Sequence, residues 1–420
     1  GLAWTDKSGA AYTVPSPGQW ALAQFGEVII ATDYIDNVQA WTLGAAGNFA
    51  DLSAGAPKAK YVSVIEPGFV MLGYYSDGTT YPNGVRWSGL NDSTSWPTIG
   101  TAAAASVQSD AQSLAGGGII TGILGAVGGA QGAVFTDKGI YRIEYIGPPA
   151  VFAFRQVDDS RGCVAPNSLI KVGQTAYGLS EDGFFSFDGT GITRIGFGKV
   201  DKFFYGDVDQ TALDRVYAAV DYERSIIVWA YPTSSSTSQR PNRWLIYNYA
   251  LGRWRYGNDA ALECEYLLPI RAGGYTLDTL DTPFPSGPDG SGGFTVDSPL
   301  YAGSRRYLAA FDSSHRLVTY SGTTLAARME TGDADLAGQR VFCSGIRVLS
   351  DAANASAFVG YRAELSEGVQ YSTAVTRGVD GVCPQRIDGQ FDRACVTIPA
   401  GEAWSYIQGV DVTARASGRR

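Results

Sequence analysis

The feature that most constrains this chain is a short pattern that occurs twice. Residues 136–143 read TDKGIYRI and residues 180–187 read SEDGFFSF: a hydroxyl residue, an acid, any residue, a glycine and then alternating large apolar positions. Each copy follows an apolar strand. Each copy therefore predicts a β-hairpin whose acid-and-glycine turn supplies the positive φ that a tight turn needs. The two glycines, Gly139 and Gly183, are 44 residues apart.

A hairpin unit that recurs every 40 to 50 residues or so is typical of β-propeller blades. Blades stack radially because a single four-stranded sheet cannot bury both of its faces. The 24 Tyr, 9 Trp and 53 Gly favour many short strands and turns. The chain has only 2 Met, and we do not expect long helices. Weaker relatives of the unit or similar apolar strands occur at residues 25–32, 68–73, 226–230 and 317–320.

We therefore predict an all-β chain with two parts. Residues 1–325 form a β-propeller of about six four-stranded blades. Residues 326–420 contain alternating strands, such as 341–348 and 394–398, and form a C-terminal β-sandwich-like module that either completes or flanks the propeller. Residues 272–299, rich in Gly, Pro, Ser and Asp, are too long for an ordinary loop, so we expect a functional or mobile insertion there.

Residues 114–135 form an apolar stretch without any charged residue, long enough to span a bilayer. Its eight glycines lower both its hydrophobicity and its helix propensity. The pair Gly128-Gly129 predicts a turn between two short apolar strands. We favour a buried hairpin, and keep a membrane span or a membrane-active loop as the alternative.

The histidine and cysteine content restricts the chemistry. His315 is the single histidine, which rules out a zinc site made by a His cluster and allows at most one His-dependent triad. The five cysteines are widely spaced and form no CxxC motif, so we expect neither a disulfide framework nor a zinc site. Small buried thiols in a reducing cytoplasm fit better. The cysteines are Cys163, Cys264, Cys343, Cys383 and Cys395.

The acidic motifs predict turns rather than catalytic or metal sites. Residues 188–191 and 288–292 look like fragments of calcium loops, but they lack the regular acidic spacing with a distal Glu. Asp158 and Asp159 are adjacent, and adjacent side chains on a strand point to opposite faces, so they do not flank one substrate. There is also no P-loop and no GxSxG motif. We predict no catalytic, cofactor-binding or metal-binding residues.

The sequence leaves one function open as an alternative: glycan binding, or sialidase-like cleavage, by a propeller used for host attachment. Residues 180–183 resemble the Asp-containing turns of sialidase-type propellers, whose active sites need three convergent arginines. Arg86, Arg142 and Arg155 are candidates, but no motif singles out three arginines. The aromatic residues in 244–256 predict a hairpin with one face in the core, or, less favoured, an aromatic platform for a sugar.

The net charge of -9 disfavours a surface that grips DNA, which needs clustered Lys and Arg to neutralise phosphates. A mildly acidic lumen would instead let DNA pass without sticking. The chain starts at Gly1 with no signal peptide, and we expect that an original N-terminal segment is missing.

A set of turn-and-strand patterns recurs along the chain, at residues 86–92 with Trp96, 161–168, 179–184, 198–204, 220–254, 388–393 and 398–410. These segments resemble tail proteins of tailed bacteriophages, in particular the tail hub or nozzle of short-tailed phages, often called the packaged-DNA-stabilisation protein. The resemblance covers roughly residues 25–420 and consists of turn-and-strand patterns rather than chemistry.

The resemblance implies a non-enzymatic structural protein without cofactors. Such proteins are large β-propellers that form a homohexameric ring under the head-to-tail adaptor and portal complex. The ring extends the DNA channel, retains the packaged genome and then releases it, without sequence-specific DNA binding. Tail fibre, spike or plug proteins would be the other partners. The expected location is the virion tail, after assembly in the cytoplasm of the bacterial host.

Overall fold

The computed structural model describes residues 5–14, 18–116, 118–258, 266–271, 306–311, 314, 316–319, 323–335 and 338–418. The chain forms two compact units, which we call unit 1 (Gly1–Tyr320) and unit 2 (Ser321–Arg420). The boundary expected from the sequence followed residue 325. The expected insertion at residues 272–299 lies outside the described residues.

The described part of unit 1 contains six antiparallel sheets, and in each of them the strands are paired in chain order. The first five sheets have four strands, and the sixth has three described strands. Their bounds are: first sheet, β1 (Ala21–Phe25), β2 (Val28–Thr32), β3 (Gln39–Thr42), β4 (Ala50–Asp51); second, β5 (Lys58–Ile65), β6 (Phe69–Ser76), β7 (Thr80–Trp87), β8 (Ala111–Ser113); third, β9 (Ile120–Gly125), β10 (Gly132–Thr136), β11 (Ile140–Gly147), β12 (Val151–Asp158); fourth, β13 (Ile170–Val172), β14 (Thr175–Ser180), β15 (Gly183–Phe187), β16 (Ile192–Arg194); fifth, β17 (Tyr217–Asp221), β18 (Ile226–Tyr231), β19 (Arg243–Asn248), β20 (Arg253–Asn258); and sixth, β21 (Tyr266–Arg271), β22 (Arg306–Phe311), β23 (Leu317–Thr319).

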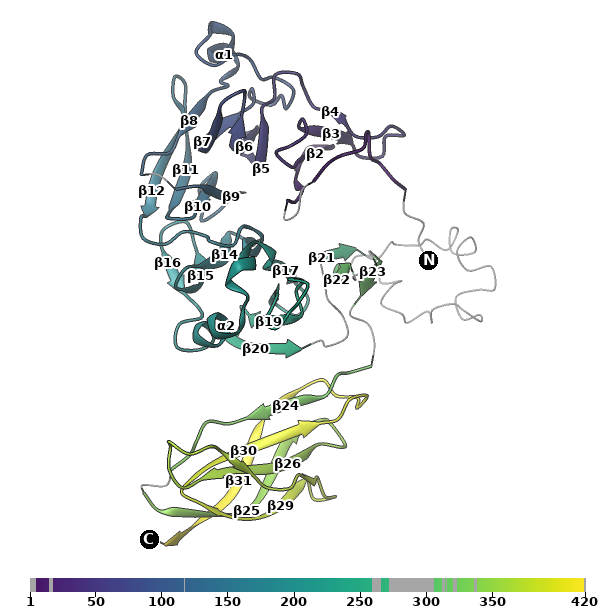
Figure 1. Cartoon of the computed structure of the whole chain (residues 1–420), viewed down its shortest axis with the longest axis vertical. Coiled ribbons are helices and arrows are strands. Elements are labelled where there is room, and N and C mark those ends of the chain that lie inside the picture. The colour runs from purple at the N-terminus through teal and green to yellow at the C-terminus, as the bar shows by residue number, and fades with distance from the viewer. Residues whose placement is uncertain are drawn as a thin grey trace, which may run out of the picture. The chain divides into compact units, whose positions relative to one another are not determined.

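The sheets of unit 1 follow one another in chain order around an arc (Figure 1). The first strands of neighbouring sheets contact each other, as β1 contacts β5, β5 contacts β9 and β17 contacts β21. An apolar core lies between each sheet and the next, so both faces of the inner sheets are buried. This is the radial stacking of a β-propeller, and it confirms the predicted fold class.

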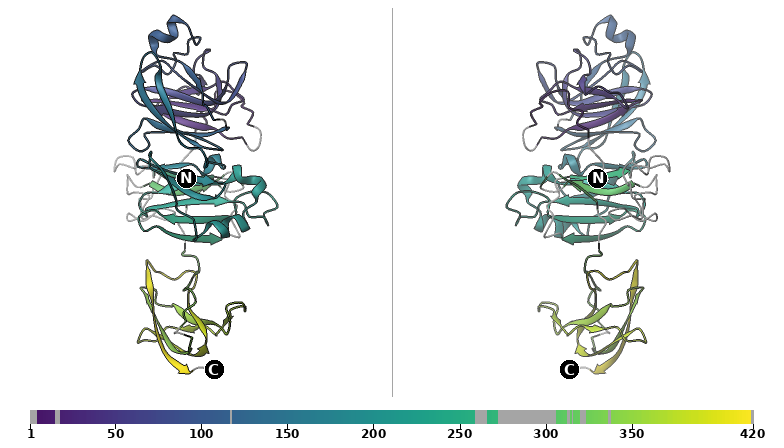
Figure 2. Two further views of the ribbon diagram at one scale, coloured as in Figure 1. Left: turned by 90° about the vertical axis from the view of Figure 1, so that its left-hand side faces the viewer. Right: turned by 90° about the vertical axis from the view of Figure 1, so that its right-hand side faces the viewer.

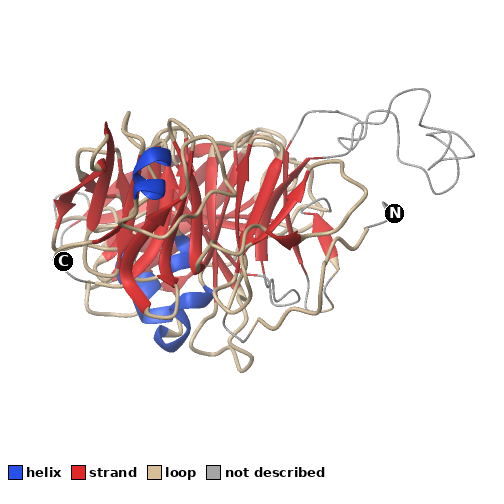
Figure 3. Ribbon diagram, turned by 90° about the horizontal axis from the view of Figure 1, so that it is seen from above, coloured by secondary structure: helices blue, strands red, loops and turns tan. Residues whose placement is uncertain are grey.

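The helical elements are short and lie between strands (Figure 3). Helix α1 (Ala102–Val107) is inserted between β7 and β8, and Thr101 caps its N-terminus by accepting a hydrogen bond from the Ala104 N–H. Helix α2 (Asp201–Asp207) connects the fourth and fifth sheets. The 3-10 turns are η1 (Pro166–Ser168) and η2 (Gln210–Arg215).

Both copies of the repeated pattern form the predicted hairpins, β10–β11 and β14–β15. In each turn the hydroxyl residue is bonded to the glycine: Thr136 Oγ1 accepts the Gly139 N–H at 2.9 Å, and Ser180 Oγ lies 3.0 Å from the Gly183 carbonyl oxygen. The predicted positive φ is confirmed at Gly183, where φ is 133°. It is wrong at Gly139, which is a glycine because a Cβ there would lie 2.5 Å from the Asp158 carbonyl oxygen.

The apolar stretch 114–135 forms part of the third sheet. Strands β9 and β10 pair with each other, and Gly128 and Gly129 lie in the connection between them with φ of 60° and 72°. The predicted glycine turn is therefore confirmed, and Val134 and Phe135 are fully buried. Among the described residues no helix has both the length and the apolar character needed to cross a membrane.

Unit 2 is a sandwich of two sheets (Figure 2). Cys343 and Ile346 of one sheet share a core with Val359 and Val396 of the other, which confirms the predicted β-sandwich-like module. One sheet has the order β24 (Ala327–Glu330), β30 (Phe391–Ile398), β26 (Ser356–Arg362), β27 (Gln370–Tyr371), with β28 (Val375–Thr376) also paired to β26; the other has the order β29 (Val382–Gly389), β25 (Arg340–Ser350), β31 (Ile407–Gly418).

The four cysteines among the described residues are buried thiols, and Cys264 lies outside those residues. Burial raises the pKa of Cys163 and of Cys395 to about 11, so neither thiol ionises readily at neutral pH. We expect a thiol reagent to label the native protein slowly, and to label all five thiols after denaturation without a reducing agent. Recovery of three thiols or fewer would show that disulfides had formed.

Candidate functional site

The three arginines considered for a sialidase-like site are distributed over two separate carboxylates. Arg142 and Arg155 lie opposite each other on β11 and β12, and their Nε atoms are 3.3 and 2.9 Å from the Glu144 carboxylate oxygens. Arg86 is buried on β7 and lies 3.6 Å from Asp77. The structure thus brings two of the three arginines together, but both of them pair with the Glu144 carboxylate.

The acidic motifs of unit 1 close turns, as the sequence predicts. Asp188 Oδ1 accepts the backbone N–H of Thr190 at 2.9 Å and that of Gly191 at 3.0 Å. Asp158 Oδ1 accepts the N–H of Ser160 at 2.8 Å, which is the same Asx-turn geometry. The described residues contain no cluster of three or more His, Cys, Asp or Glu that could hold a metal ion. His315 and residues 288–292 lie outside them.

The most developed cluster of polar side chains lies in unit 2, and sequence analysis did not identify it. It occupies the outer face of the sheet β24–β30–β26, because residues two apart on a strand share a face. The alternate residues on the same strands, such as Met329, Val396 and Ala357, point into the core. We call this outer face the polar face; its side chains are Arg328, Glu330, Ser356, Tyr371, Thr376, Arg393 and Thr397, together with the buried Phe358 and Cys395.

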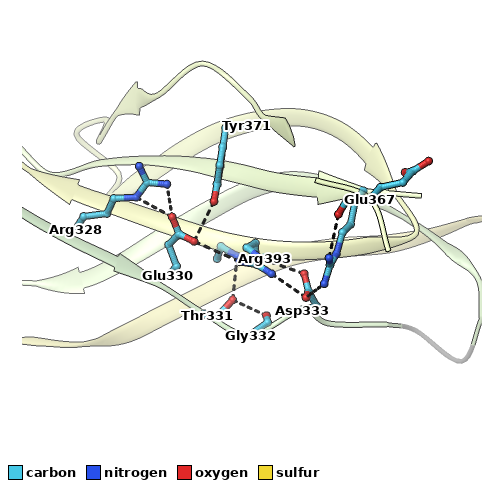
Figure 4. A network of polar contacts seen from close by, with 10 residues as sticks. Arg328, Glu330, Thr331, Gly332, Asp333, Glu367, Tyr371 and Arg393 are labelled. Carbon is cyan, nitrogen blue, oxygen red and sulfur yellow. Dashed lines mark hydrogen bonds and ion pairs between the residues drawn. The ribbon is translucent and has the colours of Figure 1, made fainter. Parts of the chain in front are cut away.

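An ion-pair network holds one half of the polar face (Figure 4). Arg393 makes a two-pronged contact with Asp333, with Nε to Oδ1 at 3.0 Å and Nη2 to Oδ2 at 2.8 Å. Its Nη1 is also 3.5 Å from Glu330, which accepts a hydrogen bond from the Tyr371 hydroxyl at 3.2 Å. Hydrogen bonds from Arg393 hold the pKa of Asp333 below its usual value.

Arg328 joins this network to two aromatic rings. Its Nε donates to Glu330 Oε1 at 2.7 Å, and its Cζ lies 5.1 Å from the Phe358 ring centroid and 4.9 Å from that of Tyr371. Burial raises the pKa of Glu330, but hydrogen bonding by Arg328 lowers it, and the pKa stays below its usual value. The guanidinium is therefore fixed in position and charged, while half of the side chain stays exposed.

A groove of about 450 Å³ lies beside Arg328 at the other end of the polar face. Arg328, Thr397, Ser356 and Thr376 form one cross-strand row along it, because each is paired in register with the next. The hydroxyls of Ser356 and Thr376 are 3.2 Å apart. The full lining is Ala326, Ala327, Arg328, Asn354, Ser356, Thr376, Thr397, Ile398 and Pro399.

A second unusual group in unit 2 is the carboxyl of Asp392, at the start of β30. Both of its oxygens are inaccessible to water and make no hydrogen bond within the described part of the chain. Oδ1 lies against Gly389, where a Cβ would be only 1.9 Å away. Burial, with a smaller contribution from the charge of Asp388, raises the pKa of Asp392 to about 6.

Asp392 should make unit 2 less stable as the pH rises. Its folded pKa of about 6 exceeds the ordinary value of 3.8, so the folded state binds the proton more tightly. The resulting penalty is absent below pH 4 and complete above pH 6. We expect Asp392→Asn to raise the free energy of unfolding at pH 7 by about 1 kcal/mol, after allowing for solvent screening, and to flatten the pH dependence between the two values.

Denaturant titrations of both proteins from pH 4 to pH 8 would measure this effect. The matched control is Asp411→Asn, because Asp411 is exposed on β31. Identical pH profiles for wild type and Asp392→Asn would show that the carboxyl is solvated in solution.

No protein-family model matches this chain, and no curated protein matches it significantly. Among solved structures, the chain is similar to the β-propeller domain of Myceliophteria thermophila Cps50 (Swd1). The identity is 11% and the TM-score is 0.35, over 75% of this chain and 100% of that one. The propeller assignment for unit 1 rests on the order and packing of its own sheets.

Proposed function

We propose that this chain is a structural virion protein of a bacteriophage tail, a hub or nozzle ring that extends the DNA channel below the head-to-tail adaptor and portal complex. Six copies would form the ring, and it would retain the packaged DNA and then allow its release. Its other partners would be tail fibre, spike or plug proteins. The chain would act without a cofactor, as a scaffold rather than an enzyme.

One observation carries this proposal: four of the segments that resemble tail hub proteins pack into a single core between the fourth and fifth sheets. Residues 161–168, 179–184, 198–204 and 220–254 are separate in the sequence, yet each contributes buried residues to that core. The contributions include Ala165, Phe184, Phe204 and Trp229. Similarity confined to isolated turns would not require such convergence.

Aromatic contacts connect these segments directly. The ring centroid of Phe184 lies 4.9 Å from that of Phe204, 4.8 Å from that of Trp229 and 5.1 Å from that of Trp254. Trp229 Nε1 also donates a hydrogen bond of 3.0 Å to the Ser168 carbonyl oxygen. The segments that carry the resemblance therefore meet in one packed junction between two blades, and this supports the proposal.

The charge of the chain is compatible with a DNA channel. A net charge of -9 gives little tendency to neutralise phosphates, and a protein that neutralises none of them does not hold DNA strongly at physiological salt. A hub must let the genome slide through its lumen, so weak attraction favours release.

Mass and symmetry test the proposal. The purified chain, with a monomer mass of 44.5 kDa, should form a sixfold ring in negative-stain electron microscopy and a hexamer in native mass spectrometry. The ring should bind the adaptor complex of its own phage. A chain that stays monomeric at high concentration, both alone and with that adaptor, would contradict the proposal.

The proposal also predicts that the protein is not a hydrolase. The chain has one histidine, and the Asp158 and Asp188 carboxylates are occupied in turns. Assays on sialosides, chitin-type polymers and peptidoglycan should give no turnover above that of a denatured sample. Turnover that disappears on replacement of a single Asp, Glu or Tyr would contradict the proposal of a structural protein.

A further inference from the structure

We infer that the groove on the polar face of unit 2 is a carbohydrate-binding site. The inference goes beyond the proposed tail function and does not depend on it. The alternative function expected from the sequence places glycan binding on the propeller. This groove instead lies on β24, β30, β26 and β28 of unit 2. The shape of the groove, its lining and its fixed guanidinium favour this class of ligand.

The groove has the size and the rigidity that a small ligand requires. Its volume of about 450 Å³ falls within the usual range of small-molecule sites. Its floor is a paired sheet rather than a loop, so the row Arg328, Thr397, Ser356 and Thr376 is held by the strand register. Neighbouring strands are about 4.8 Å apart, which sets the spacing between successive polar groups.

The lining matches a ligand that is rich in hydroxyl groups. Each hydroxyl can donate one hydrogen bond and accept two, so a row of them recognises a partner with the same dual capacity. Thr397 makes no side-chain hydrogen bond among the described residues, and it stands between Arg328 and Ser356 in the row. Asn354 adds an amide at the rim, fixed by its 2.7 Å hydrogen bond to Glu402.

Arg328 supplies directional donors at the end of the row. Its Nε and Nη2 face Glu330, so Nη1 is the guanidinium nitrogen that remains for a ligand, and Arg328 lines the groove. The exposed ring of Tyr371 lies against the same guanidinium, with the Cζ atom 4.9 Å from the ring centroid. Because Glu330 neutralises this single cation and the chain is acidic, a polyanion such as DNA is disfavoured relative to a sugar.

The test uses the whole 420-residue chain. A glycan array that displays neutral and acidic oligosaccharides would identify ligands, and titration calorimetry with the glycan of highest signal would give affinities. Thr397→Val keeps the shape of the side chain and removes only the hydroxyl, so we expect affinity to fall about three- to tenfold. Arg328→Gln removes a charged donor, and we expect a loss of about tenfold or more.

The matched control is Thr413→Val, which makes the same change on β31 of the other sheet, away from the groove. Its affinity should equal that of wild type. Melting curves would check each variant; if Arg328→Gln proves unstable, Thr397→Val alone decides. The inference is overturned if no glycan on the array binds, or if Thr397→Val binds the glycan as tightly as wild type does. Binding is measured irrespective of ring formation, so failure here is distinct from failure of the tail proposal.

Discussion

Gly183→Val is expected to lower the free energy of unfolding of unit 1 by about 3–5 kcal/mol. Gly183 has a φ of 133°, in a region that residues with a side chain rarely adopt, and valine is β-branched. A Cβ at this position would also lie 2.2 Å from Asp201 Oδ2. Strain in the backbone and overlap with the carboxylate therefore act together. Thermal and denaturant melts of mutant and wild type would measure the loss.

The Asp201 carboxylate cannot easily move aside. Its Oδ1 accepts the Phe184 N–H at 3.1 Å, and Asp201 itself lies buried in the first turn of α2. On the other side is Gly196, where a Cβ would lie 1.9 Å from Oδ1. Two glycines thus enclose one buried carboxylate, and burial raises its pKa.

Two controls separate strain from overlap. Gly191→Val adds the same side chain where the structure has open space and no positive φ, so it should change stability little. In a cycle of Gly183→Ala with Asp201→Ala, the double mutant should be more stable than the sum of the single effects predicts, because the overlap is gone. An unchanged melting temperature for Gly183→Val would show that the turn has a different conformation in solution.

The propeller could be predicted because its signals are local. The alternation of apolar residues in β11 and β15 and the acid-and-glycine turns beside them depend only on near neighbours in the sequence. The contacts that require a glycine at each of the two turns come from outside the local pattern. Gly183 is enclosed by Asp201 from the next helix, and Gly139 lies against the Asp158 carbonyl oxygen of a neighbouring strand.

The polar face could not be predicted for the same reason. Arg328 and Glu330 alternate on one strand, which does indicate a shared face. Their partners Tyr371 and Arg393 come from later strands, and Tyr371 is 41 residues from Glu330. Sequence patterns identify strands of this module, but only the pairing order of β24, β30 and β26 places these side chains together.

Trp229→Ala should destabilise unit 1 by about 3–5 kcal/mol, as expected for a large buried aromatic residue. Trp229 is fully buried on β18, and its ring centroid lies 4.8 Å from that of Phe184 and 5.6 Å from that of Trp254. Its truncation removes the Trp229 ring from the core between the fourth and fifth sheets and leaves the Ser168 carbonyl oxygen without the Trp229 Nε1 donor. Denaturant melts followed by tryptophan fluorescence and circular dichroism would measure the change.

A matched control is Trp41→Ala. Trp41 also donates its Nε1 hydrogen to a backbone carbonyl, that of Gly47 at 2.8 Å, but it is only partly buried on β3. We expect this variant to lose about 1–2 kcal/mol, since little apolar surface is removed from the core. Trp229→Phe should lie between the two alanine variants, because it keeps an aromatic ring and loses the hydrogen bond. Equal losses for Trp229→Ala and Trp41→Ala would mean that the fourth and fifth sheets do not depend on this core, and the packed junction that supports the tail hub proposal would then have no energetic basis.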